Sequence, residues 1–303
     1  MLRIDELSVE FETKRGTAYV LDRVSFDISP GEVVGLVGES GSGKSVLSYA
    51  VSGLLDPAAR ITHGAILWKG QPIEVQREKR HPKVPVAQIF QNPRASLNPI
   101  RTVGRQIADV AGSQRVAELL QSVRLPAGKA ASYPSELSGG QCQRIGIALA
   151  LGCEPELLIA DEPTTGLDVI TEMTILDLIG ELSRARGMGT LLVTHDLALA
   201  ALRCDRIVVM HAGQVVEVAP SEVIVQAARH PYAAKLRACV PQFNEDAASL
   251  SVIPGQLPDL TGPLPVCRFS ARCVRHTDDC ETSPLPVVQI AEDHVVSCRY
   301  PLC

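Results

Sequence analysis

The chain has 303 residues, enough for one large domain with an appendage or for two smaller domains. Hydrophobic residues make up 46% of it, which is typical of a folded protein and excludes a disordered or fibrous one. The formal net charge of -5 provides no positive field for a phosphate backbone, so we expect no nucleic acid partner.

Neither a membrane span nor a signal peptide is visible. No run approaches the roughly 18 consecutive apolar residues that a membrane-spanning helix needs. The first residues, MLRIDELSVEF, alternate charged with apolar side chains and lack the apolar core of a signal peptide. We therefore expect a chain that does not cross a bilayer by itself and is not exported, and stable disulfides are disfavoured.

The first elements are strands. Residues 3–11 and 18–28 alternate apolar with polar side chains, which predicts two strands. The fully apolar run 33–38 predicts a buried parallel strand, followed by a glycine-rich loop and a helix.

The rest of the chain alternates helices and strands. The apolar spacing from about residue 94 to 154 predicts an α-helical insert. Beyond it, a helix at 171–186 alternates with strands, as in a parallel α/β sheet. Proline and glycine become frequent after about residue 240, where we place a domain boundary. The predicted strands of this part are 156–162, 189–196 and 205–218.

The glycine-rich loop GESGSGKS, Gly38 to Ser45, matches the phosphate-binding pattern GxxxxGK[ST] in its required place between a strand and a helix. Its glycines let backbone N–H groups converge on phosphate oxygens, and the helix N-terminus adds a favourable dipole. We expect Lys44 to reach the outer phosphates of a nucleotide and Ser45 to place its hydroxyl on Mg²⁺.

Two acidic residues end the apolar strand LLIADE. Asp161 and Glu162 stand where a nucleotide site needs a partner for Mg²⁺ and a group that polarises the attacking water. Acids at strand ends are more often solvated caps when they occur alone. The phosphate loop in the same chain favours the functional interpretation.

The sequence LSGGQ, Leu137 to Gln141, places two glycines before a predicted helix and so provides a second anion-binding nest. With this motif, residues 1 to about 235 resemble the nucleotide-binding subunits of ATP-binding cassette (ABC) transporters. The resemblance implies an α/β ABC-type P-loop NTPase domain over 1–240, with a small antiparallel β-subdomain and an α-helical subdomain at about 94–154. A C-terminal cysteine-rich extension would occupy 241–303.

The same resemblance implies roles for individual residues. Catalysis would depend on Glu162, His195 of LLVTHD and Gln91 of QIFQNPR, and Ser45, Asp161 and Gln91 would organise Mg²⁺. Phe11, or else Tyr19, would stack on adenine, although either ring could simply pack in the β-subdomain. ATP would lie between two subunits, with the signature residues acting in trans and Asp168 of TTGLD crossing the dimer interface. The signature residues are Ser138, Gly139, Gly140 and Gln141, and the other nucleotide-binding residues are Gly38, Ser40, Gly41, Ser42, Gly43, Lys44, Ser45 and Val46.

Segments outside these motifs are similar to one branch of the family, the dipeptide and oligopeptide importers, which also includes nickel importers. They are NPRASLNP, DEPTTGLD, HAGQVVE, RHPYAAKL and IPGQLPDL.

This resemblance implies an ATPase subunit, peripheral at the cytoplasmic face of the inner membrane, that powers import of di- or oligopeptides. Its partners would be a homologous second ATPase subunit, two membrane permease subunits and an extracytoplasmic solute-binding protein. Import of nickel or another small solute, and a nucleotide switch without permeases, are the alternatives. Chromosome-maintenance ATPases are disfavoured because hundreds of residues of coiled coil separate their motifs.

Four cysteines of the tail follow the spacing C-x5-C-x6-C-x17-C: Cys267, Cys273, Cys280 and Cys298. Four thiolates can ligate zinc or hold a 4Fe-4S cluster, and the gaps are wider than in most zinc sites. The spacing matches the importer branch, including the arginine before the second cysteine, and this resemblance favours the iron-sulfur cluster over Zn²⁺ or free thiols. Because the tail is rich in proline, we expect ligation to fix its fold. We expect Cys142, Cys153, Cys204 and Cys239 to be small core residues.

Overall fold

The computed structural model describes residues 1–73, 85–243 and 252–303. These residues form two compact units. The first unit comprises the described parts of 1–29, 34–82 and 194–303, and the second comprises those of 30–33 and 83–193. The glycine-rich loop therefore belongs to the first unit and the helical insert to the second.

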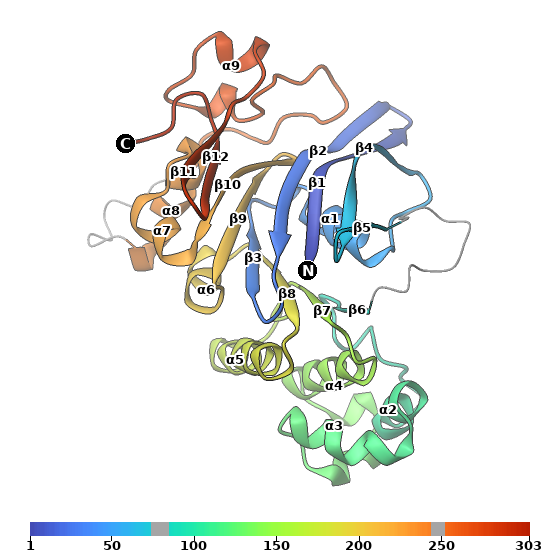
Figure 1. The fold of residues 1–303 in the computed structure, drawn as a ribbon. Helices are drawn as coiled ribbons and strands as arrows, with labels where there is room; N and C mark the ends of the chain where they lie inside the picture. Colours follow the sequence, from blue (N-terminus) through green and yellow to red (C-terminus); the bar gives the residue numbers. More distant parts are fainter. Residues whose placement is uncertain (74–84, 244–251) are drawn as a thin grey trace. The chain divides into compact units, whose positions relative to one another are not determined.

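A four-stranded antiparallel sheet forms the N-terminal part of the first unit (Figure 1). The pairing of its long first strand shifts in register between Ile4 and Leu7. The side chains before and after this shift are both buried. The two strands predicted from the sequence are confirmed. The sequence did not indicate the other two strands of this sheet. In the longer of these, which has ten residues, only Ile66 is buried. In the order β2-β1-β4-β5, the strands are β1 (Leu2–Thr13), β2 (Gly16–Ile28), β4 (Ala59–Trp68) and β5 (Gln71–Pro72).

A second sheet of the first unit carries the phosphate loop. Its strand β3 (Val33–Val37) is buried at every residue, which explains the uninterrupted apolar run, and it pairs in parallel with β9 (Arg206–His211). The strands of this unit follow in the order β11-β12-β10-β9-β3, with β10 (Gln214–Pro220), β11 (Val287–Ala291) and β12 (His294–Ser297). The helices are α1 (Lys44–Ser52), α6 (Leu197–Arg203), α7 (Ser221–Ala227), α8 (Pro231–Ala238) and α9 (Asp279–Thr282).

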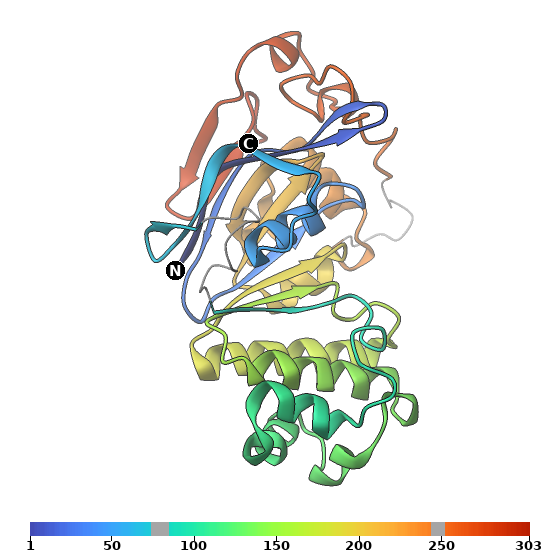
Figure 2. The same cartoon turned by 90° about the vertical axis from the view of Figure 1, so that its right-hand side faces the viewer.

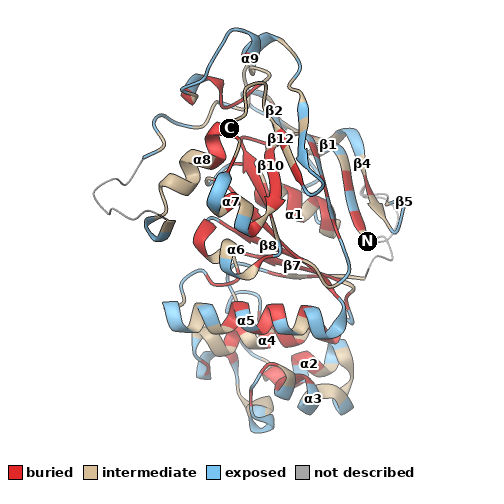
Figure 3. Cartoon of the chain, turned by 60° about the vertical axis from the view of Figure 1, so that its left-hand side comes forward, coloured by how far each residue is buried: buried red, intermediate tan, exposed pale blue. Residues whose placement is uncertain are grey.

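The C-terminal tail is part of this sheet. β12 pairs with β10, which is buried along most of its length (Figure 3). Beside it, the buried carboxylate of Glu217 contacts His294 Nε2 at 2.8 Å and accepts a hydrogen bond from the backbone N–H of His230 at 2.7 Å. Strand pairing and buried hydrogen bonds thus hold the tail, whereas the sequence led us to expect metal ligation in this role.

The second unit contains a parallel sheet and the helical insert. Its strands lie in the order β8-β7-β6, and α4 and α5 run side by side in Figure 2. The predicted helix at 171–186 and the helical insert are confirmed, although the first α-helix of the insert begins only at Val103. The elements are β6 (Val86–Ile89), α2 (Val103–Ala111), α3 (Val116–Ser122), α4 (Gly139–Gly152), β7 (Leu157–Asp161), α5 (Val169–Arg186) and β8 (Gly189–Thr194). Among the described residues, no helix combines the length and hydrophobicity needed to cross a membrane.

Candidate functional site

The phosphate loop Gly38–Ser45 joins β3 to α1 in the first unit, as the sequence predicts. A Cβ at Gly38 would lie 2.1 Å from the carbonyl oxygen of Met210, so no other residue fits there without a backbone shift. Gly43, with φ 99°, is in the left-handed region that favours glycine and precedes the first residue of α1. The loop backbone therefore needs glycine at these two positions, and it leads directly into the N-terminus of α1, where backbone N–H groups can bind an anion.

Lys44 lies against the loop that precedes it. Its ammonium group donates hydrogen bonds to the carbonyl oxygens of Gly38, at 2.8 Å, and Glu39, at 2.9 Å, and the side chain is buried. Ser45, one residue further, is exposed, so its hydroxyl can reach a bound ion. The oxygens of a bound phosphate group could also accept hydrogen bonds from this ammonium group.

The second unit brings together two predicted catalytic residues that lie far apart in the sequence. Asp161 is the last residue of β7 and is buried, and Glu162 follows it with φ 44°. Glu162 Oε2 accepts hydrogen bonds from Gln91 Nε2, at 2.8 Å, and from Thr165 Oγ1, at 3.1 Å. Sequence reasoning missed Thr165, although it lies in the TTGLD segment that contains Asp168.

The signature motif forms the N-terminus of α4 in the same unit. Ser138 caps the helix by accepting a hydrogen bond from the backbone N–H of Gln141, whose side chain accepts one from the Ser138 N–H. Gly140 lies against α5, because a Cβ there would be 2.5 Å from Thr171 Cγ2. Sequence reasoning also missed Arg94, which donates a hydrogen bond to the carbonyl oxygen of Leu137 at 2.8 Å.

Asp168 caps α5. It accepts hydrogen bonds from the backbone N–H of Thr171 at 3.0 Å and from its hydroxyl at 2.7 Å, and these bonds lower the pKa of the Asp168 carboxyl. The side chain is exposed, and its expected place at a dimer interface stays a prediction. The exposed His195 follows β8, and Asp196 caps the next helix.

The two aromatic candidates for adenine stacking have different surroundings. Phe11 lies near the end of β1, is half-buried, and pairs with Ala18 and Ala59 on either side. Tyr19 is exposed at 41%, and its backbone carbonyl accepts a hydrogen bond from Arg268 of the tail. Phe11 stays the preferred prediction, because Tyr19 lines a cavity to which the phosphate loop contributes no described residue.

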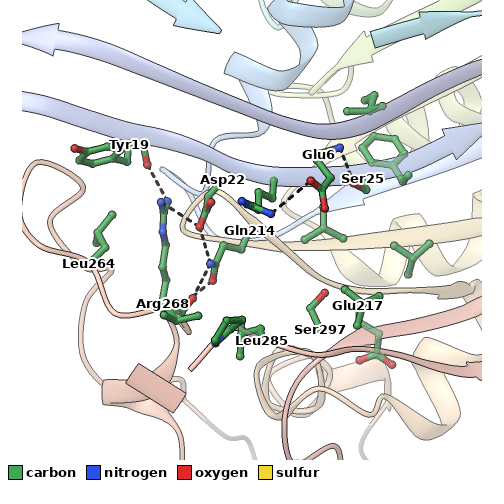
Figure 4. Close-up of a pocket in the computed structure, with 18 of the residues that line it drawn as sticks. Glu6, Tyr19, Asp22, Ser25, Gln214, Glu217, Leu264, Arg268, Leu285 and Ser297 are labelled. Carbon is green, nitrogen blue, oxygen red and sulfur yellow. Dashed lines mark hydrogen bonds and ion pairs between the residues drawn. The ribbon is translucent and has the colours of Figure 1, made fainter. Parts of the chain in front are cut away.

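That cavity, of about 1240 Å³, lies in the first unit between the N-terminal sheet and the tail (Figure 4). Arg268 Nη1 donates a hydrogen bond to the Tyr19 carbonyl oxygen at 2.8 Å, and Gln214 Nε2 donates to Asp22 Oδ2 at 2.9 Å. None of the described residues that line it belongs to the phosphate loop, so this cavity is not the nucleotide site.

The four predicted ligand cysteines line one small cavity, of about 10 Å³. All four are free thiols. The pKa of the Cys267 thiol is raised to about 11, mainly by burial and to a smaller extent by the neighbouring Cys280, Cys298 and Cys273. Within the described residues, no group of three or more His, Cys, Asp or Glu side chains is arranged to hold a metal ion. The structure thus gathers the four thiols without closing them around a single ion.

The remaining cysteines differ from one another. Cys142 and Cys204 are buried, as predicted for small core residues, and Cys239 is partly buried. The prediction for Cys153 is wrong, because this residue is exposed as the C-cap of α4.

Comparisons with known proteins agree with these motifs. Residues 21–165 match the family model "ABC transporter", and residues 216–280 match "Oligopeptide/dipeptide transporter, C-terminal region". The chain is 40% identical to the dipeptide transport ATP-binding protein DppD of Escherichia coli, over 100% of this chain and 97% of the relative. It is 38% identical to the protein of the same name from Bacillus subtilis, over 98% of this chain and 94% of the relative.

Solved structures give the same result for the fold. CbiO1 of Clostridium perfringens, part of the ABC transporter complex cbiONQ, has a TM-score of 0.65 and 29% identity, over 74% of this chain and 90% of that one. The dimeric ATP-binding cassette MJ0796 in a post-hydrolysis state, bound to ADP and Pi, has a TM-score of 0.62 and 26% identity, over 73% of this chain and 99% of that one. The chain therefore belongs to the ABC transporter family, as an ATPase that carries the C-terminal region of the oligopeptide and dipeptide transporters.

Proposed function

We propose that this chain is the ATP-hydrolysing subunit of an importer for di- or oligopeptides. The observation that supports it best is the similarity to the E. coli dipeptide transport ATP-binding protein, which extends over the whole chain, tail included. The match of residues 216–280 to the C-terminal region of oligopeptide and dipeptide transporters supports the same substrate class independently of the ATPase motifs.

The predicted site residues would have separate roles in hydrolysis. Lys44 and the backbone N–H groups of the phosphate loop would hold the β- and γ-phosphates, and Ser45 and Asp161 would hold Mg²⁺. Glu162 would polarise the attacking water, with Gln91 keeping its carboxylate in place through the 2.8 Å hydrogen bond. His195 would contact the γ-phosphate.

A second subunit would complete the ATP site. Ser138, Gly139 and Gly140 at the N-terminus of α4 present a capped helix end and two small residues to an incoming phosphate, and would complete the site of a homologous ATPase. Asp168 would lie at that interface. Residues 241–303 would form the extension typical of the importer branch.

The complete importer would contain two permease subunits and would receive its peptide from an extracytoplasmic solute-binding protein. The chain would then be a peripheral protein at the cytoplasmic face of the inner membrane. Its lack of a spanning helix among the described residues agrees with a peripheral position.

Reconstitution tests this proposal. We expect the chain to co-purify from membranes with apolar permease chains, and the complex in vesicles to take up a labelled dipeptide only with ATP and the solute-binding protein. A Lys44→Ala complex should assemble without transport. Recovery without permeases would contradict the transport role, and uptake of Ni²⁺ but of no peptide would contradict the substrate class.

We further propose that the four cysteines hold a 4Fe-4S cluster. Four free thiols around one cavity are the required donor set. A zinc ion bonds each thiolate at about 2.3 Å and needs all four sulfurs closed around one atom. A cluster is larger and holds its thiolates further apart, and the spacing C-x5-C-x6-C-x17-C, which resembles that of the importer branch, is what favours it over zinc.

When bound, the cluster would join the segments that carry the four cysteines, and its role here would be structural. Protein purified without oxygen should contain iron and sulfide and absorb visible light. Cys280→Ser should lose this absorption, whereas Cys303→Ser, at an exposed cysteine outside the set, should keep it. Colourless, iron-free protein with one zinc per chain would refute the cluster.

A further inference from the structure

Arg272, the arginine before the second cavity cysteine, reaches from the tail to the phosphate loop. It ends the 3₁₀ turn Ser270–Arg272. Its guanidinium donates two parallel hydrogen bonds to the carboxylate of Glu39, from Nη1 to Oε1 at 3.1 Å and from Nη2 to Oε2 at 3.0 Å. The side chains are 6% and 28% exposed, so water screens this pair poorly.

Glu39 is the second residue of the loop GESGSGKS, and its backbone takes part in the loop's own hydrogen bonds. Its carbonyl oxygen accepts hydrogen bonds from Lys44 Nζ, at 2.9 Å, and from the backbone N–H of Ser42, at 3.2 Å. Its own N–H donates to the hydroxyl of Tyr232 at 3.0 Å. A displacement of Glu39 would therefore move the ammonium group expected to bind the phosphates.

A cluster of buried aromatic rings packs against Arg272. The ring centroids of Tyr232 and Phe269 are 5.3 Å apart, and that of His211 lies 4.4 Å and 5.2 Å from them. All three residues are buried, and the guanidinium of Arg272 lies 5.8 Å from the Phe269 centroid. Arg272 Nε also donates a hydrogen bond to the Pro254 carbonyl oxygen at 2.8 Å. With its rotamer held by packing and this bond, the guanidinium is preorganised to bind Glu39.

We propose that Arg272 is a positioning residue for ATP binding: the tail supplies it to hold the phosphate loop, through Glu39, in the shape that binds nucleotide. This inference rests on the role of Gly38–Ser45 as the ATP phosphate loop. It gives the tail of the first unit a direct part in nucleotide affinity.

The experiment is an equilibrium titration with a fluorescent ATP analogue, together with the KM and kcat of ATP hydrolysis by the assembled importer. Arg272→Met keeps the length of the side chain and its contact with Phe269 but removes the charge, and Glu39→Gln keeps the shape of the carboxylate. We expect each variant to raise the Kd about tenfold to a hundredfold, because a charged, largely buried pair is lost. We expect KM for ATP to rise with it, while kcat at saturating ATP stays within about twofold.

Three comparisons distinguish positioning from a general structural role. The double variant Arg272→Met/Glu39→Gln should bind ATP no more weakly than the weaker single variant, because one interaction has been removed twice. Arg272→Lys should recover part of the affinity, since it restores the charge without the fork. Arg229→Met is the matched control: it removes a 3.0 Å hydrogen bond to the Leu302 carbonyl oxygen in the tail, away from the loop, and should leave the Kd unchanged.

The proposal is wrong if Arg272→Met lowers the melting temperature but binds ATP as the unsubstituted protein does, or if Arg229→Met weakens binding equally. A failure of the underlying ATP site is recognised separately, since the unsubstituted protein would then bind no nucleotide.

Discussion

Replacing Glu162 by Gln should stop turnover without weakening ATP binding. Glu162 Oε2 accepts hydrogen bonds from Gln91 Nε2 and from Thr165 Oγ1. The amide keeps one oxygen that can accept both, so the local structure should survive and only the basicity of the group is lost. Loss of a general base costs about a hundredfold to ten-thousandfold in rate, and at 1.36 kcal/mol per factor of ten this is roughly 2.7 to 5.4 kcal/mol of activation free energy.

The assay is phosphate release in a single turnover, beside an equilibrium titration with a fluorescent ATP analogue. Thr165→Val is the matched control, because it removes one of the two hydrogen bonds and leaves the carboxylate; it should slow hydrolysis less than about tenfold. Retention of more than about a tenth of the turnover by Glu162→Gln would refute a general-base role for Glu162. Equal loss of ATP binding would show that the carboxylate holds the site together.

Two further predictions follow from buried contacts. Burial lowers the pKa of His211 to about 4 from 6.5. As pH falls, the unfolded chain therefore binds a proton at this residue before the folded protein does. The contribution of neutral His211 to the stability of the fold is complete above pH 6.5 and is lost as pH falls toward 4. Between pH 7 and pH 5 the free energy of unfolding should therefore fall by about 1 to 2 kcal/mol more than in His211→Phe, measured by urea titration, and equal losses would contradict this. Gly140→Ala should reduce ATP hydrolysis because its methyl group would meet Thr171 Cγ2 at 2.5 Å; adding Thr171→Ser, which removes that methyl but keeps the hydroxyl on Asp168, should restore part of the rate, and no recovery would place the defect in the trans contact instead.

The elements that the sequence predicted best are those whose pattern is local. A short, uninterrupted apolar run followed by a glycine-rich loop favours an inner strand, and β3 is one. β4 escaped because most of its side chains are not buried, so its hydrophobic alternation is weak. The pairing of β12 with β10 could not be predicted, since four residues carry little periodicity and their partner lies far away in the chain.

The same distinction holds for the site. The phosphate loop and the signature are contiguous, and their glycines and caps could be recognised directly. The hydrogen bond from Gln91 to Glu162 joins residues 71 positions apart, and that from Arg272 to Glu39 joins residues 233 apart. Because such pairs depend on how the chain folds back on itself, residue types alone gave no signal for them.

The pairing of β12 with β10 has a consequence for synthesis of the protein. β10 ends at Pro220, and β12 begins only at His294, so a ribosome completes the first strand well before its partner emerges. During that interval the nascent chain presents the backbone groups of β10 at an open sheet edge, where another nascent chain can pair. A premature stop codon between these two strands would therefore leave a product prone to aggregation, even though all of its ATPase motifs had been translated.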